Sequence, residues 1–375
     1  MDIHGYCDDR FAHVRDVFER NFTEHNEVGA SFALTLEGEY LIDMWAGHRD
    51  AAATLPWEEN TIVNVYSTTK TMTALSALLL ADRGELDFCA RVASYWPEFA
   101  QNGKEDIEVR HLMSHSAGLS GLEEFNDPSD YYDWDLICDR LAAQAPWWTP
   151  GTQSGYHAIT QGYLVGEVVR RITGRSLGTF FREELAEPLG ADFHIGVTPE
   201  HFHRIGELIP PAASPAAVEY PEGSVAARTF GRGMIDALAS RTEAWRRAEI
   251  PAANGHGNAR SVVRVQTLLA NHGTAFGKTL MSPDGCLRVM EEQTNGTDLV
   301  LGVPTRYGLG YGLNQNGAMG PNPNTCYWGG WGGSAIVVDL DARVCFSYVM
   351  NRMDSGVLGD PRGFGLMEAV FDALQ

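Results

Sequence analysis

The feature that most constrains this chain is the segment Ser67-Thr68-Thr69-Lys70, which runs directly into a long apolar stretch. Apolar side chains recur along residues 71–80 at helical spacing, and Gly84 stands where a helix cap is expected. We therefore expect a buried helix that Ser67 opens. Lys70 lies three positions further on, so its side chain shares a helix face with Ser67. The chain is thus expected to fold around a helix that carries a hydroxyl and an amine side by side at its N-terminal end.

A hydroxyl held next to an amine is the basic unit of an activated serine nucleophile. The dipole and the free N–H groups at a helix N-terminus also favour negative charge that develops there. Ser-x-x-Lys also occurs by chance, and a serine at a helix start is commonly only an N-cap. Lysine, however, occurs elsewhere only at Lys104 and Lys278, and arginine supplies nearly all other positive charge. Because a buried lysine can lose its proton whereas arginine cannot, this usage favours a catalytic Ser67 and Lys70.

Composition narrows the classes of partner and chemistry. The formal charge of −21 argues against nucleic acid or an anionic membrane surface as a partner. Residues 1–10 hold neither a basic region nor an apolar run, and no apolar stretch is long enough for a membrane span, so we expect a cytoplasmic enzyme. The cysteines are scattered, without a Cys-x-x-Cys pair. His111 and His115 are four residues apart, but Leu112 replaces the glutamate of a zinc-protease helix, so no metal site is expected.

Apolar and aromatic patterning predicts strands near both ends of the chain and helices between them. The expected strands span residues 30–36, 39–47, 334–339 and 344–350. The expected helices besides the one after Ser67 span residues 8–25, 159–172, 176–187 and 363–374. We therefore expect an α/β protein of the α+β type, with one sheet domain built from residues 1–66 and 261–375. A mostly helical domain, residues 67–260, would be inserted into it, with the active site between the two.

Turn-rich segments supply further candidate site residues. Tyr156 follows a glycine at the entrance of the helix expected at 159–172, where a side chain can point into a cleft. A phenol near a lysine ammonium loses its proton more easily and is then a capable general base, although most tyrosines simply pack. Two Trp-Gly-Gly triplets, at 328–330 and 331–333, precede a strand, so the backbone there must approach a ligand or another segment closely. The Pro/Ala-rich segment 208–223 is expected to be a loop and is a candidate flap beside a pocket.

Together these pieces resemble the penicillin-recognising serine hydrolases, and within them the class C β-lactamase-like branch with its family VIII carboxylesterases. Ser67 and Lys70 match the Ser-x-x-Lys motif of the family. Tyr156, with His157 and Ala158, matches a relaxed Tyr-x-Asn motif, and Trp-Gly-Gly matches the third motif of the esterase-like members. The resemblance covers roughly residues 25–355 in the right order, through the segments 110–119, 150–152, 185–190 and 348–353.

The resemblance implies a β-lactamase/D-Ala-peptidase-like fold, in which helices flank an antiparallel sheet. It also implies that Ser67, Lys70 and Tyr156 are catalytic, and it leaves open which of Lys70 and Tyr156 is the base. No metal or cofactor is implied.

The third motif is taken to begin at Trp328, because the family's interval from this triplet to the aspartate that ends the next strand fits Asp339. On that alignment, Trp328, Gly329 and Gly330 would bind substrate. The oxyanion hole would be formed by the backbone N–H groups of Ser67 and Trp331.

Two departures from the family pattern bear on the substrate. Ala158 replaces the asparagine of the second motif, and Trp328 replaces the lysine of the third motif. The carboxylate of a β-lactam or a peptide C-terminus would then lack a positive partner. We therefore expect a carboxylesterase that acts on neutral small-molecule esters of short to medium acyl length.

Other interpretations stay open. Within the family they are a β-lactamase, a D-alanyl peptidase and an acyltransferase. A non-enzymatic scaffold would be expected to have a degraded site, whereas Ser67, Lys70 and Tyr156 are all present. A Ser-His-Asp hydrolase would need a Gly-x-Ser-x-Gly nucleophile elbow, and the segment Gly332-Gly333-Ser334-Ala335-Ile336 lacks the final glycine.

Overall fold

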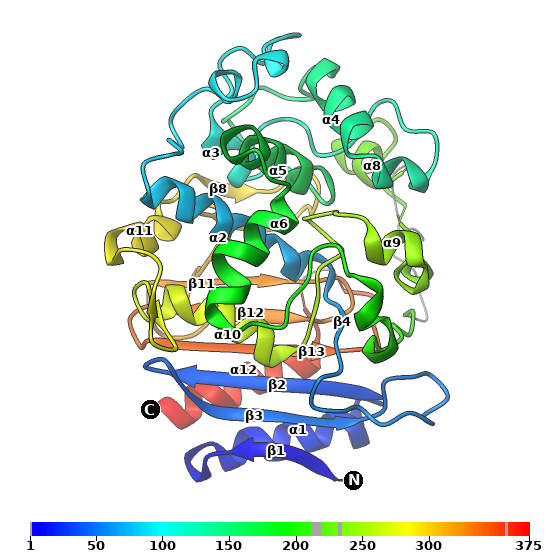
Figure 1. Cartoon of the computed structure of the whole chain (residues 1–375), viewed down its shortest axis with the longest axis vertical. Helices are drawn as coiled ribbons and strands as arrows, with labels where there is room; N and C mark the ends of the chain where they lie inside the picture. Colours follow the sequence, from blue (N-terminus) through cyan, green and yellow to red (C-terminus); the bar gives the residue numbers. More distant parts are fainter. Residues whose placement is uncertain (1, 212–218, 232–234, 357–358) are drawn as a thin grey trace.

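The central element of the protein is a nine-stranded antiparallel sheet with the strand order β1-β3-β2-β13-β12-β11-β10-β9-β8. The computed structural model describes the whole chain except residues 1, 212–218, 232–234 and 357–358. Most of the sheet occupies the lower part of Figure 1, and most of the helices lie above it. An antiparallel sheet with flanking helices confirms the fold class that the sequence predicts.

The strands of this sheet are β1 (Ile3–Cys7), β2 (Gly29–Leu36), β3 (Glu39–Gly47), β8 (Thr294–Thr297), β9 (Pro304–Tyr307), β10 (Gly312–Leu313), β11 (Thr325–Gly329), β12 (Ala335–Asp339) and β13 (Val344–Met350). Two short pairs lie outside it, β4 (Val63–Asn64) with β5 (His256–Gly257) and β6 (Thr274–Ala275) with β7 (Lys278–Thr279). The helices are α1 (Ala12–Glu24), α2 (Thr69–Asp82), α3 (Val109–Met113), α4 (Trp134–Ala143), α5 (Thr160–Thr173), α6 (Leu177–Phe181), α7 (Glu187–Leu189), α8 (Val225–Phe230), α9 (Glu243–Arg247), α10 (Ala259–Ala270), α11 (Pro283–Leu287) and α12 (Pro361–Leu374).

Both ends of the chain meet in the sheet, as predicted. The N-terminal strand β2 pairs with the C-terminal strand β13 in a register that sets Ala30 opposite Met350. Successive strand residues point to opposite faces. Cys345 contacts the Val263 carbonyl of α10, and the ring of Phe346 packs 5.7 Å from a ring of α12. Helix α10 therefore covers one face of the sheet, while α12, packed against α1, covers the other (Figure 1).

Several boundaries differ from the sequence prediction. The helix expected at 8–25 is a 3₁₀ turn, Asp9–Phe11, followed by α1. The helix expected at 176–187 is α6, one π turn over Arg182–Ala186, and the short α7. Pro188 sits in α7 and lacks the N–H of a regular helical bond, which accounts for the irregular turn before it. Strand β1 was not predicted, because it is an exposed edge strand without an alternating apolar pattern.

Helix α2 is a core helix. Every residue from 69 to 80 is buried, and the helix packs against α5, α6 and α11. A helix that is surrounded on all sides in this way belongs to the interior of a protein. The buried helix that the sequence predicts is confirmed, but it begins at Thr69. Ser67 lies in the 3₁₀ turn Tyr66–Thr68 just before it.

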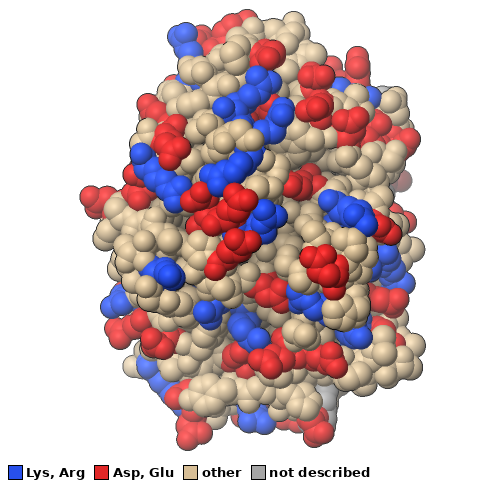
Figure 2. Space-filling model, viewed as in Figure 1, with Lys and Arg blue, Asp and Glu red and all other residues tan. Residues whose placement is uncertain are grey.

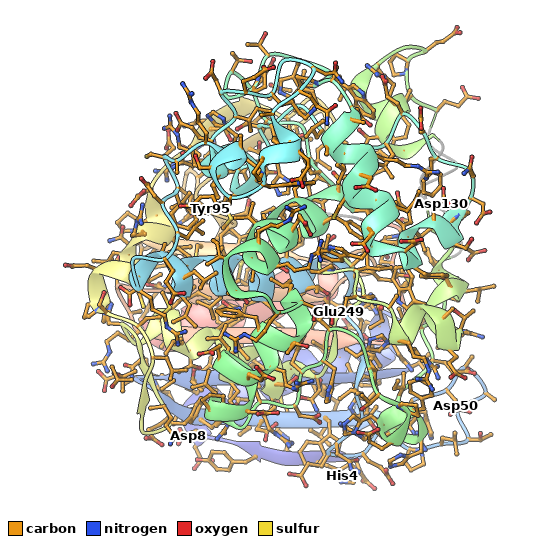
Figure 3. The ribbon with its side chains drawn as sticks, turned by 45° about the horizontal axis from the view of Figure 1, so that its top comes forward. His4, Asp8, Asp50, Tyr95, Asp130 and Glu249 are labelled. Carbon is orange, nitrogen blue, oxygen red and sulfur yellow. The ribbon has the colours of Figure 1, made fainter. Side chains whose placement is uncertain are left out.

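The surface carries both signs of charge. On the face shown in Figure 2, acidic and basic side chains are interspersed. Some carboxylates hold loops together: Asp50 accepts the N–H of Leu55, and Glu249 accepts the N–H of Gly178 (Figure 3). Within the described residues, no helix has both the length and the apolar composition needed to cross a membrane. The cytoplasmic location and the division of the chain into residues 1–66 with 261–375 and residues 67–260 stay predictions.

Candidate active site

Ser67 lies in a tight turn that contacts strand β11. The residue before it, Tyr66, has φ of +44°, a left-handed conformation that is uncommon for a residue with a side chain. Thr68 Oγ1 and Ser334 Oγ are hydrogen-bonded at 2.9 Å, and the Ser334 hydroxyl donates to the Val65 carbonyl at 2.8 Å. These bonds tie the turn to the segment just before β12. The Ser67 side chain is therefore held in one place, partly exposed, at the N-terminal end of α2.

Lys70 lies about one helical turn after Ser67, and its side chain is fully buried. Its Nζ lies 3.1 Å from Ser67 Oγ, 2.7 Å from the Ala158 carbonyl oxygen and 2.8 Å from the Ala252 carbonyl oxygen. Burial lowers the pKa of the Lys70 amine well below its ordinary value of 10.5, because the charged form loses its hydration. The spacing in the sequence thus brings the amine and the hydroxyl together, as predicted, and the surroundings favour the neutral amine.

Tyr156 reaches the same serine from the loop before α5. Its hydroxyl lies 2.6 Å from Ser67 Oγ, and its backbone N–H donates to Asp298 Oδ1 at 3.0 Å. Burial raises the pKa of the Tyr156 phenol above its ordinary value, and this outweighs the lowering by the hydrogen bond to Ser67. The expectation that a lysine ammonium lowers this pKa is wrong, because burial disfavours the charge on the amine as well.

The turn that follows β11 packs against Val65, two residues before Ser67. A Cβ on Gly330 would lie 2.1 Å from the Val65 carbonyl oxygen and 2.3 Å from Ser334 Oγ, so glycine is required for this approach. The next residue, Trp331, packs its ring 5.0 Å from the ring of Tyr66. In the part of the chain that the structure describes, the backbone N–H groups of Ser67 and Trp331 donate to no protein acceptor. Both N–H groups are therefore free, and both residues line the cavity that opens at Ser67.

Trp328 lies on β11 opposite Ile336, and its side chain belongs to an aromatic cluster behind Tyr156. Its ring is stacked 5.4 Å from that of His115, which in turn lies 5.1 Å from the ring of Tyr156. His115 Nδ1 accepts the backbone N–H of His157, and burial lowers the pKa of His115. His111 Nδ1 accepts a different backbone N–H, that of Glu108. The two histidines thus have separate structural roles.

A cavity of about 240 Å³ opens at Ser67. Its walls include Tyr66, Tyr156, Ile159, Phe230 and Trp331, and none of the described residues that line it carries a charged side chain. Tyr220, from the segment expected to be a flap, also lines the cavity. Residues 212–218 of that segment lie outside the described residues.

The structure distributes the predicted substrate-binding residues over two places. Trp328 and Gly329 line a neighbouring cavity of about 280 Å³ that also reaches Tyr156. Gly330 lines neither cavity and is wedged against the Val65 carbonyl.

Some groups that shape the site were missed. The carbonyls of Ala158 and Ala252 hold the Lys70 amine, and any residue could supply such a carbonyl, so no pattern reveals them. Asp298 anchors the loop beside Tyr156, because its Oδ1 accepts the N–H groups of Tyr156, Val300 and Leu301. Asp298 is far from Tyr156 in the sequence, and no motif marks it.

Comparison with known proteins defines the class to which this fold and site belong. The Beta-lactamase family matches residues 14–369. The chain therefore belongs to the Beta-lactamase family, and the predicted family and fold are confirmed.

Particular relatives narrow this further. The Esterase/beta-lactamase LipL of Mycobacterium tuberculosis is 36% identical, over 96% of this chain and 86% of its own length. The crystal structure of a family VIII carboxylesterase is similar at 43% identity with a TM-score of 0.94, covering 100% of both chains. A penicillin-binding protein homolog from Caulobacter crescentus is similar at 41% identity with a TM-score of 0.93, also over 100% of both chains.

Proposed function

We propose that this chain is a carboxylesterase that hydrolyses neutral esters through an acyl-enzyme on Ser67. The observation that carries the proposal is the line of contacts from Lys70 through Ser67 to Tyr156, beside a cavity whose described lining residues are all uncharged. The similarity to a family VIII carboxylesterase and to LipL supports an esterase within the family.

Lys70 is proposed as the base that activates Ser67. A neutral amine has two N–H donors and one lone pair, and the carbonyls of Ala158 and Ala252 accept two donors. The lone pair is then left for the Ser67 hydroxyl at 3.1 Å. A lysine ammonium would also fit three acceptors, but burial favours the neutral amine. In acylation the Ser67 proton moves to Lys70 Nζ while Oγ bonds to the ester carbonyl carbon.

Tyr156 is proposed as the acid for the leaving alcohol. Its raised pKa keeps the phenol protonated at neutral pH. When the bond between the acyl carbon and the alcohol oxygen breaks, the alkoxide takes the Tyr156 proton. The ammonium of Lys70, whose Nζ lies 5.0 Å from the centre of the phenol ring, then stabilises the phenolate. Water attacks the acyl-enzyme and gives its proton to the phenolate, and Lys70 returns its proton to Ser67 Oγ as the acid leaves.

The oxyanion hole is proposed to consist of the N–H groups of Ser67 and Trp331. In support of this assignment, both N–H groups are free in the described structure, and Ser67 and Trp331 line the same cavity. Donors of this kind act on the charge that develops in the tetrahedral intermediate, and each contributes about 10²–10³-fold to the rate.

The substrate is proposed to be a neutral ester with a short to medium acyl chain. Among the described residues, no cation lines the cavity at Ser67 that would bind a carboxylate, as a β-lactam or a peptide C-terminus requires. The cavity is about 240 Å³, larger than the roughly 150 Å³ cavity that accommodates benzene. This volume fits an acyl group of modest length.

Initial rates on p-nitrophenyl esters of increasing acyl length test the proposal. We expect turnover of the shorter esters that disappears in Ser67→Ala and in Lys70→Arg, because arginine cannot act as the base. Tyr156→Phe should lower kcat by about 10²–10⁴-fold. Undiminished turnover by Ser67→Ala would refute the proposal. Turnover of a chromogenic cephalosporin in place of the esters would favour a β-lactamase, and ester exchange with an added alcohol would favour an acyltransferase.

A further inference from the structure

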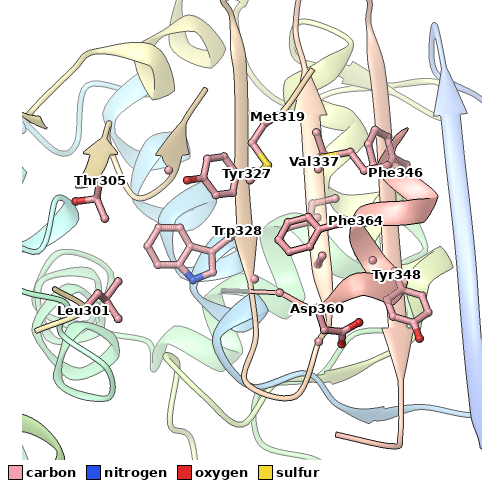
Figure 4. A pocket seen from close by; sticks show the side chains of 18 of the residues that line it. Leu301, Thr305, Met319, Tyr327, Trp328, Val337, Phe346, Tyr348, Asp360 and Phe364 are labelled. Atoms are coloured by element: carbon pink, nitrogen blue, oxygen red, sulfur yellow. The ribbon is translucent and has the colours of Figure 1, made fainter. Parts of the chain in front are cut away.

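The cavity of about 280 Å³ beside the candidate site, shown in Figure 4, has no role in the chemistry described so far. It lies over the strands β11, β12 and β13 and is bounded on one side by the start of α12. It shares Tyr156 and Leu301 with the cavity at Ser67, so the two cavities adjoin at these two residues. Ser67 itself lines only the first cavity.

Most of the walls of this second cavity are apolar, although the hydroxyl-bearing residues Thr305, Tyr307 and Tyr327 also line it. Val337, Phe346 and Phe364 face it from the sheet and from α12 (Figure 4). Among the described residues that line it, Asp360 is the one charged residue, and it is buried. The Asp360 carboxylate binds the Arg362 guanidinium at 2.7 Å, so it is not free to bind a ligand. An apolar cavity without an available charge selects an uncharged, water-avoiding group.

The arrangement around Tyr156 indicates which half of an ester each cavity takes. In the acyl-enzyme the acyl group is bonded to Ser67 Oγ, so it must occupy the cavity that Ser67 lines. The leaving alcohol must have its oxygen next to the Tyr156 hydroxyl, which protonates it. Beyond Tyr156 lies the second cavity, which the rest of the alcohol enters if it extends away from Ser67.

We propose that the second cavity is the binding site for the alcohol half of the substrate and that the enzyme selects esters of bulky apolar alcohols. This inference rests on the proposed esterase function. The cavity of about 280 Å³ is nearly twice the size of the roughly 150 Å³ cavity that binds benzene. A two-ring aromatic alcohol or an alkyl alcohol of similar volume fits it. The acyl half is the smaller group.

Gly363 offers a way to fill this cavity without disturbing the catalytic residues. It lines the cavity from α12, and a Cβ there would meet nothing closer than 3.7 Å, from the ring of Tyr348. Gly363→Phe would place a phenyl group into the cavity, whereas Gly363→Ala is the matched control, with the same loss of glycine but little added bulk. Gly363 lies in the first turn of α12, and alanine is a better helix former than glycine.

The first experiment compares two ester series in the wild-type protein and both variants. One series has a fixed acetyl group and alcohols from methanol to 2-naphthylmethanol, and the other has a fixed methyl alcohol and growing acyl chains. In the wild type and Gly363→Ala we expect kcat/KM of the first series to rise by about fourfold for each buried methylene equivalent. In Gly363→Phe this rise should disappear, while methyl acetate and the acyl series keep their rates. An equal rise in Gly363→Phe, or a flat first series in the wild type, would overturn the inference.

A binding measurement separates this inference from the esterase proposal. The alcohol 2-naphthylmethanol is titrated into the Ser67→Ala protein with and without Gly363→Phe, and quenching of tryptophan fluorescence is recorded, since Trp328 lines the cavity. We expect saturable binding that weakens at least about tenfold with Gly363→Phe. Such binding without ester turnover would retain the cavity assignment and refute the esterase function. Turnover of esters without any binding difference would retain the function and overturn the assignment.

Discussion

Replacing Gly330 with alanine tests whether the turn after β11 supplies an oxyanion donor. A Cβ at this position would lie 2.1 Å from the Val65 carbonyl oxygen and 2.3 Å from Ser334 Oγ. Carbon and oxygen atoms come to rest at about 3.3–3.6 Å even in their closest favourable contacts. The turn must therefore move away from Val65 by about 1 Å. Trp331 is the next residue, so its backbone N–H moves with the turn, away from Ser67.

The size of the effect follows from this displacement. Removing one oxyanion donor costs about 10²–10³-fold in kcat, or about 2.7–4 kcal/mol, and a misplacement of about 1 Å alone can cost about 10²-fold. We expect kcat of Gly330→Ala on p-nitrophenyl acetate to fall by at least about 10²-fold. KM should change little, because the donor binds charge that exists only in the transition state.

The neighbouring glycine supplies the control. A Cβ on Gly329 would meet only the Ser334 carbonyl oxygen at 3.6 Å and the Gly359 nitrogen at 3.9 Å, which are ordinary contacts. Gly329→Ala should therefore keep kcat within about twofold of the wild type on methyl acetate, whose alcohol is too small to need the second cavity that Gly329 lines. Thermal unfolding of both variants reports whether the fold is intact. A folded Gly330→Ala protein with wild-type kcat would refute the assigned donor, and an equal loss in Gly329→Ala would show that the loss is not specific to it.

Two further substitutions test buried ionisable side chains. Lys70→Met should stabilise the protein at neutral pH. Burial lowers the pKa of Lys70 in the folded state. Between this lowered pKa and the ordinary value of 10.5, the amine is protonated in the unfolded chain and neutral in the folded protein. The free energy of unfolding of the wild type therefore rises with pH toward 10.5. Urea denaturation between about pH 7 and about pH 10 should show that the free energy of unfolding rises less with pH in the variant than in the wild type. Equal slopes in the two proteins would contradict the argument. Arg362→Met should destabilise the protein by about 3–5 kcal/mol. It removes the cation that binds the buried carboxylates of Glu27 and Asp360 at 2.8 and 2.7 Å and leaves them with hydrogen bonds from neutral donors such as the Tyr348 hydroxyl. Calorimetry measures this, and an unchanged Tm would contradict it.

The parts of the fold that could be predicted from the sequence are those whose signal is local. Helix α2 has apolar side chains on every turn, and β12 and β13 are apolar runs on either side of a turn. Each of these elements can therefore be recognised from a few consecutive residues. Strand β1 depends on β3 for its pairing and has no apolar pattern of its own, so local reasoning misses it. The π turn before Pro188 depends both on how the helix packs and on the N–H that Pro188 lacks. The apolar pattern of the sequence does not predict such a turn.

The candidate site likewise contains residues that could be predicted from local sequence and residues that could not. Ser67 and Lys70 are three residues apart on one turn, so their proximity follows from helix geometry. Tyr156 is 89 residues from Ser67 in the sequence. Only the resemblance to a known family predicted that the two residues share a site. Asp298 and the Ala252 carbonyl act through backbone contacts that the fold creates, so the sequence alone could not reveal them. The second cavity has the same origin, since it lies between strands and a helix from distant segments.

The burial of α2 links the fold to the chemistry. The chain carries 49 acidic residues, and a single carboxylate beside Lys70 would favour the ammonium and raise the amine pKa. Among the described residues, none acts on Lys70 in this way, and burial alone lowers its pKa. The nearby acid, Asp298, directs Oδ1 to the N–H groups of Tyr156, Val300 and Leu301. A core helix can thus hold a neutral amine in a strongly acidic protein, because its neighbours offer carbonyl oxygens and a hydroxyl and no opposite charge.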